Sequence, residues 1–373
     1  MPLHDPDGAH RHEHGDGSEA EDASAEERAH VDRERERMKG FVQQLSAEDI
    51  TSGNWFSRLL SHALSTDTTR VDWQYFQEKY AGVPADAVVE ERIRMAARYA
   101  SIEGGMSAGA YSGIAIFVVP LIVPVAVTSA LVDISFTAQL QLRLAYDIAV
   151  LYGVPIDVSD PEDLWRLIRI AFTIKAGEAA EEGLLKVVPA IVQPIVKTFY
   201  RKEVVTAGRA LPVVGKYLLQ RNVIKIGIPL VGVPLAITLN HWTTKIAGQH
   251  ARAVFRNQAR IIETAATIAA RSRHPQLMLW IAWVTITADG KPTSDESQLM
   301  RHLVREVRER YEVVDEELAR VVEVDWAEVL RRVDAEPGDR RDLLDAARAV
   351  SEIDGAANQR ERLVLDRLEQ LCA

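Results

Sequence analysis

The sequence predicts an all-α protein: a large helical bundle with apolar hairpins broken by proline and glycine, followed by a smaller helical bundle. From Glu26 onward, apolar residues recur at spacings of three and four, and alternating β-branched runs are rare. Hydrophobic residues make up 47% and charged residues 26% of the chain, an ordinary globular balance. At 373 residues the chain exceeds a typical single domain, so two folded units are expected.

We expect three segments: a tail over residues 1–37, a large helical domain over 38–260 and a smaller one over 261–373. The tail is acidic and rich in histidine, with too few large apolar side chains to offset the entropy of ordering, so we expect disorder. It lacks the basic and then apolar start of a secretion signal. A single cysteine, Cys372, excludes an intrachain disulfide framework, and a cytoplasmic location is expected.

Local signals place individual helices. Helical periodicity covers residues 87–99 and, most clearly, residues 133–152. Gly153 is expected to end the second helix in a left-handed conformation. Asp160 is expected to cap the next helix, with Pro161 at its first position.

Long uncharged stretches are the most unusual feature of the large domain. Between Glu103 and Asp133 there are 29 consecutive uncharged residues, enough for a transmembrane candidate. Three such stretches carry proline pairs, so we expect broken helices or helical hairpins; the pairs are Pro120 and Pro124, Pro189 and Pro194, and Pro229 and Pro234. Glycines at a spacing of four predict a close helix contact; they are Gly105, Gly109 and Gly113. These segments form either the buried centre of a bundle or a membrane-associated surface.

A strongly basic block lies beside the apolar stretches. Residues 186–273 contain 14 bases and 2 acids, although the whole chain has a net charge of −10. Such a block favours an anionic partner. Anionic lipid is favoured over nucleic acid, because the intervening residues are aliphatic rather than stacking aromatics. The candidate lipid contacts are Lys197, Arg201, Lys202, Arg209, Lys216, Arg221, Lys225, Trp242, Lys245, Arg252 and Arg256.

The C-terminal domain repeats one pattern, an Asp-Gly pair followed by a glutamate. The first copy is Asp289-Gly290 with Glu296, and the second is Asp354-Gly355 with Glu361. Part of an EF-hand loop has this spacing, but the earlier ligand positions carry unsuitable residues, so an EF-hand is excluded. The glycines are also typical of helix ends, and the glutamates of capping boxes that begin the next helices.

Two family resemblances cover most of the chain. The run from Leu131-Val132-Asp133 to Tyr152-Gly153, followed by Asp160-Pro161-Glu162, resembles the EcsC family over about residues 45–258. That resemblance implies a helical, membrane-associated protein without an agreed biochemical activity. The repeated Asp-Gly pattern resembles the TerB-like tellurite-resistance family over about residues 262–373. It implies a compact bundle in bacterial stress-response systems that binds metal or protein, with Asp289, Glu296, Asp354 and Glu361 as divalent-metal ligands.

Gly105-Met106-Ser107-Ala108-Gly109 matches the G-x-S-x-G motif of serine hydrolases, with Asp133 and His241 or His250 to complete a triad. That motif needs a preceding strand, whereas helix is predicted there. We therefore expect a non-enzymatic protein, peripheral on the inner membrane face, that binds anionic lipid and an unidentified protein partner. No cofactor is expected beyond the divalent metal, and the sequence does not define the oligomeric state. The alternatives are an integral channel-like protein, a soluble metal-responsive adaptor and a hydrolase that uses Ser107.

Overall fold

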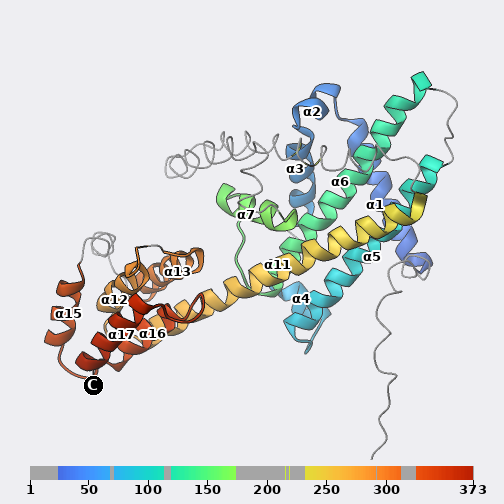
Figure 1. Ribbon diagram of the computed structural model, residues 1–373. Coiled ribbons are helices and arrows are strands. Elements are labelled where there is room, and N and C mark those ends of the chain that lie inside the picture. Colours follow the sequence, from blue (N-terminus) through green and yellow to red (C-terminus); the bar gives the residue numbers. More distant parts are fainter. Residues whose placement is uncertain are drawn as a thin grey trace, which may run out of the picture. The chain divides into compact units, whose positions relative to one another are not determined.

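The computed structural model describes residues 24–67, 71–112, 119–173, 215, 218, 232–290, 292–311 and 325–372. These residues form thirteen α-helices and contain no strand (Figure 1). The predicted all-α fold is therefore confirmed for the part of the chain that the structure describes. The chain divides into two compact units, unit 1 over Met1–Phe255 and unit 2 over Arg256–Ala373.

In unit 1, helix α6 is the central element and contacts α1, α3, α4, α5 and α7 (Figure 1). The core of unit 1 includes the fully buried side chains of Trp55, Phe56, Leu142 and Ile148. The helices are α1 (Ala25–Gln43), α2 (Ala47–Ser52), α3 (Trp55–Asp67), α4 (Trp73–Lys79), α5 (Ala85–Ser112), α6 (Val119–Leu151), α7 (Pro161–Ala171) and the first part of α11 (Gly232–Arg271).

Helix α1 corrects the tail prediction. Residues 25–37 belong to this helix, so the expected disorder is wrong for them, while residues 1–23 lie outside the described part. The side chain of Ser24 accepts a hydrogen bond from the Glu27 amide, and Glu27 accepts one from the Ser24 amide, which completes a capping box. Ion pairs then attach the charged helix to the bundle: Glu27 to Arg98 on α5, and Glu34 to Arg143 on α6.

The last residues of α5 and the first residues of α6 and α11 lie on the same side of unit 1, which we call the apolar end: residues 104–112, 119–132 and 232–244 (Figure 1). Gly105 of α5 lies against Ile237 of α11. The amide of Asn240 donates to the carboxylate of Asp133 on α6 (3.1 Å). At the other end of these helices, Gly248 lies between Ile93 and Leu144. These contacts pack α11 against both α5 and α6.

Unit 2 is a helical bundle around α12. Nine of the thirteen side chains of α12 are buried, and the helix contacts α13, α15, α16 and α17. Cys372 lies in this core, where burial raises the pKa of its thiol. The helices are the last part of α11, α12 (Pro275–Thr287), α13 (Ser294–Tyr311), α15 (Trp326–Ala335), α16 (Arg341–Ser351) and α17 (Gln359–Cys372).

No helix in the described ranges combines the length and the apolar character that a membrane span requires. The uncharged stretch between Glu103 and Asp133 is instead divided between α5 and α6. Pro120 is the second residue of α6, where the missing amide donor costs little, and the helix continues through Pro124.

Candidate functional site

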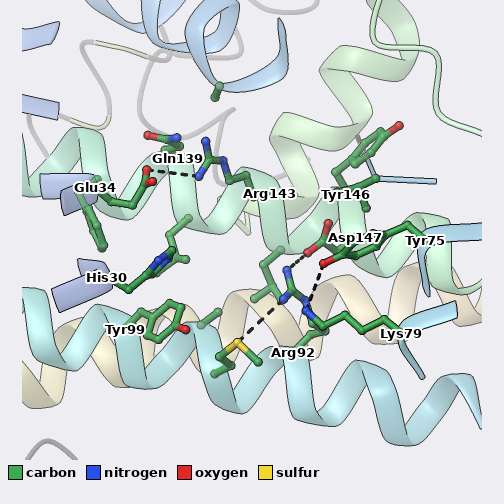
Figure 2. Close-up of a pocket in the computed structure, with 17 residues that line it drawn as sticks. His30, Glu34, Tyr75, Lys79, Arg92, Tyr99, Gln139, Arg143, Tyr146 and Asp147 are labelled. Atoms are coloured by element: carbon green, nitrogen blue, oxygen red, sulfur yellow. Dashed lines mark hydrogen bonds and ion pairs between the residues drawn. The ribbon is translucent and has the colours of Figure 1, made fainter. Parts of the chain in front are cut away.

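Unit 1 contains a cavity of about 400 Å³ between α1, α3, α4, α5 and α6 (Figure 2). This is within the size range of small-molecule pockets. Three cationic side chains line it from three different helices, Lys79 on α4, Arg92 on α5 and Arg143 on α6. Two carboxylates, Glu34 on α1 and Asp147 on α6, lie among them. The lining therefore has an excess of positive charge.

Arg92 and Asp147, which both line the cavity, form an ion pair between α5 and α6 (Figure 2). The Asp147 side chain is only 5% exposed and that of Arg92 is 25% exposed. Burial opposes the charge of Arg92, but the carboxylate of Asp147 raises the pKa of the guanidinium above its ordinary value. The pair is therefore ionised, and it fixes the position of Arg92.

A second ion pair holds Arg143 at the opposite wall. Its Nη1 lies 3.6 Å from the carboxylate of Glu34 on α1. In the amide orientation that satisfies both groups, with oxygen and nitrogen exchanged, the oxygen of Gln139, one turn earlier on α6, accepts a hydrogen bond from Nε of Arg143 (3.2 Å). Figure 2 shows Glu34 and Arg143 directed toward one another across the cavity.

Lys79 is placed differently from the two arginines. Its ammonium lies 5.4 Å from the ring centre of Tyr75 and 5.6 Å from that of Tyr80, which are cation–π distances. It also donates to the Tyr75 hydroxyl (3.1 Å). Within the described residues, Lys79 has no carboxylate partner. Lys79 and Tyr75 are exposed and lie at the mouth of the cavity.

The remaining wall combines phenol groups with apolar side chains. Burial raises the pKa of Tyr99, and burial together with the charge of Asp147 raises that of Tyr146, so both hydroxyls stay protonated and can donate. The apolar part of the wall is formed by Phe136, Met95, Ala96, Leu140 and Leu144. The cavity can therefore take a molecule that has both an anionic and an apolar part.

Only part of the predicted lipid-contact set lies in the described residues. Trp242 is 54% exposed, and Lys245 is exposed one turn later on α11. Arg252 lies ten residues after Trp242, and its guanidinium pairs with Glu90 (2.7 Å) and Asp86 (3.5 Å). Arg256 is the first residue of unit 2. The others, Lys197, Arg201, Lys202, Arg209, Lys216, Arg221 and Lys225, are outside the described ranges.

Of the three glycines predicted to line a helix contact, Gly105 has described surroundings. A Cβ atom there would lie 3.3 Å from Ile237, so the close approach is between α5 and α11. Gly109 belongs to α5, and Gly113 lies outside the described residues. Ser107 is inside the same helix, so the G-x-S-x-G run does not form the strand-turn-helix that exposes a nucleophile.

Next to the uncharged segments of α5 and α6, and within that of α11, the three helices share a largely buried polar cluster. The carboxylate of Glu103 is fully buried and lies 3.8 Å from Nε of Arg35, while Asn240 donates to Asp133. The Ser101 hydroxyl donates to the carbonyl of Ala97 and lies 3.0 Å from Nδ1 of His241. This polar belt, as we call residues 101, 103, 133, 240 and 241, forms the boundary of the apolar end.

In unit 2, the two repeated motifs form helix caps. Glu296 accepts a hydrogen bond from the Thr293 amide (2.6 Å), and Glu361 accepts one from the Asn358 amide (2.7 Å). Gly290 and Gly355 have positive φ angles. Among the described residues, no three acidic, histidine or cysteine side chains are grouped so that they could hold a metal ion. The proposed ligands Asp289, Glu296, Asp354 and Glu361 therefore stay a prediction.

Glu361→Gln is expected to reduce the pH dependence of unit 2 stability. Burial raises the pKa of Glu361, and the charges of Glu296, Asp354 and Asp289 raise it further. A raised pKa means that folding takes up a proton, so this group adds stability as the pH falls and loses it as the pH rises through the folded pKa. Glutamine keeps an oxygen for the Asn358 amide but does not titrate.

Urea unfolding of the full chain at several pH values, with hydrogen exchange in α17 as the report on unit 2, measures this effect. The exposed Glu369→Gln change on the same helix is the control. An unchanged pH slope in the Glu361 variant would contradict the pKa assignment.

Comparisons with known protein families, with curated proteins and with solved structures find no match to this chain. By its fold and its cavity, the chain is a two-unit α-helical protein with a charged pocket in unit 1. The cavity residues were not among the predicted site residues. They lie between positions 30 and 147 on five elements, and no local spacing connects them.

Proposed function

We propose that this is a non-enzymatic protein that associates with the inner face of a membrane through the apolar end of unit 1. The observation that carries the proposal is that three uncharged helix segments, residues 104–112, 119–132 and 232–244, lie on the same side of the unit. Together they bring uncharged, largely apolar sequence to that side of a chain that is otherwise rich in charge. Such a concentration of apolar residues marks an interaction surface.

The position of Trp242 supports a membrane as the partner. It follows Asn240 and His241 of the polar belt directly, so it lies where the apolar end gives way to polar side chains. A half-exposed tryptophan at such a boundary is typical of the headgroup region of a bilayer. Lys245 is one turn further along α11, within reach of lipid phosphates. The basic sequence block 186–273 adds attraction to anionic lipid.

The family resemblances agree with this assignment. The EcsC-like region coincides with most of unit 1 and implies membrane association, and the TerB-like region implies that unit 2 binds a partner protein in a stress response. On this proposal the protein is peripheral, with its apolar end in the outer part of one leaflet. The uncharged segments would be covered by lipid.

The double variant Trp242→Ser with Lys245→Glu is expected to bind anionic vesicles at least about tenfold more weakly. It removes the interfacial ring and reverses a charge, and each basic residue near an anionic leaflet contributes about 1 kcal/mol. Flotation of the full chain with vesicles of phosphatidylcholine and phosphatidylglycerol measures this binding. Raising the salt concentration should also weaken it.

The matched control is Trp73→Ser with Arg94→Glu, which changes one exposed aromatic residue and one exposed cation of unit 1 outside the apolar end. This control should float like the unaltered protein. Equal loss in both double variants, or no flotation of the unaltered protein, would contradict the proposal.

A further inference from the structure

We propose that the cavity of unit 1 is a binding site for a soluble organic phosphate, with the phosphate held between Lys79, Arg92 and Arg143 and the organic part against the apolar wall. No part of the membrane proposal uses this cavity. Its lining residues on α5 end at Tyr99 and those on α6 begin at Phe136. Both therefore lie on the side of Glu103 and Asp133 that is away from the apolar end.

The charge of the lining selects an anion. Arg92 and Arg143 are each paired with one carboxylate, so their positive charges are balanced within the cavity. Lys79 adds a cation that no described carboxylate neutralises. An anionic ligand at the mouth would complete the charge balance, whereas a cationic ligand would be repelled by Lys79. Several N–H donors from different helices suit a group with three acceptor oxygens.

The cationic groups are held in place before a ligand arrives. Asp147 fixes Arg92, and Glu34 with Gln139 fixes Arg143 at the wall. The Tyr75 ring and hydroxyl hold Lys79. Because these side chains are already ordered, binding costs little of their conformational entropy. Figure 2 shows the three cations arranged around the same cavity.

The other side of the cavity explains why the ligand is organic rather than inorganic phosphate. Phe136 and Leu144 are buried, and Met95 and Leu140 extend the apolar wall between them and Tyr99. A volume of about 400 Å³ is much larger than a phosphate ion and fits a ring or a short chain attached to it. A ligand with both parts would use the charged and the apolar surface together.

A phosphate group also occurs in lipid headgroups. The position of the cavity favours a soluble organic phosphate over a lipid as the ligand. If the apolar end contacts the bilayer, the cavity opens on the aqueous side of the polar belt, so a soluble ligand reaches it directly. This choice of source rests on the proposed membrane association. The recognition of phosphate by Lys79, Arg92 and Arg143 does not.

Titration calorimetry of the full chain tests the proposal with three probes: phenyl phosphate, inorganic phosphate, and dihexanoyl phosphatidic acid below its micelle concentration. Phenyl phosphate is expected to bind, and inorganic phosphate to bind at least about tenfold more weakly because it lacks the apolar part. Lys79→Gln is expected to weaken phenyl phosphate binding by about tenfold or more. Lys79 is exposed, so the variant should fold, which circular dichroism verifies.

The matched control is Lys39→Gln, an exposed lysine of α1 that does not line the cavity and pairs with Glu36. It should leave the affinity for phenyl phosphate unchanged. Absence of heat with phenyl phosphate, or equal affinities of the Lys79 variant and the unaltered protein, would overturn the proposal. Tighter binding of dihexanoyl phosphatidic acid than of phenyl phosphate would overturn the soluble source. Vesicle flotation is a separate measurement, so failure of the membrane proposal is recognised independently.

Discussion

Arg92→Met is expected to lower the free energy of unfolding of unit 1 by about 3–5 kcal/mol. The variant breaks the ion pair of Arg92 with Asp147, whose side chain is 5% exposed, and removing one member of a buried ion pair is strongly destabilising. Urea unfolding of the full chain, followed by far-ultraviolet circular dichroism, measures the change. The matched control is Arg94→Met, which removes an exposed arginine from the same helix and is expected to change stability by less than about 0.5 kcal/mol.

The double variant Arg92→Met with Asp147→Leu separates charge from packing. If the cost of the single change comes from the uncompensated carboxylate, removing that carboxylate should recover much of the lost stability. If the Arg92→Met variant is as stable as the unaltered protein, the Arg92–Asp147 ion pair is not an essential contact of α5 and α6.

Gly248→Leu is expected to destabilise unit 1 by about 1–3 kcal/mol through overpacking. A Cβ atom at this position would lie 2.8 Å from Cγ1 of Ile93 and 2.9 Å from Cδ2 of Leu144, so a larger side chain must displace both. Gly40→Leu is the matched control, because a Cβ there meets nothing within 4 Å and leucine favours a helix by up to about 1 kcal/mol.

Thermal unfolding of both glycine variants measures the difference. The Gly248 variant should unfold at a lower temperature than the unaltered protein, and the Gly40 variant at the same or a higher one. Equal midpoints for the two variants would show that the contact of α11 with α5 and α6 is looser than its geometry indicates.

The sequence allowed the fold class and several local boundaries to be predicted, because these depend on signals within a few residues. Gly153 has the expected positive φ angle, and α7 begins at Pro161 with the Asp160 side chain accepting from the Asp163 amide (3.2 Å). Thr293 and Asn358 begin capping boxes as expected. Propensity and capping act locally, so a single sequence contains the information they need.

Helix α1 was missed in part because its composition resembles that of a disordered segment. Two local signals could have identified it: the Ser24 and Glu27 capping box, and the apolar positions Val31, Met38 and Val42 on one helix face. The cavity had no comparable signal. Its ion pairs join residues as far apart as Glu34 and Arg143, and such pairing depends on how α1 packs against α6. Tertiary packing, which no local pattern encodes, brings these groups together.

The burial of Cys372 has a practical consequence for labelling. Thiol-reactive dyes attack the thiolate, and a raised pKa together with a position in the core of unit 2 keeps that form scarce and poorly accessible. The chain has no other cysteine. An introduced thiol, for example at position 242 through Trp242→Cys, would therefore take up a dye much faster than the native one. Fluorescence from such a sample reports the surroundings of the chosen site without prior removal of the natural cysteine.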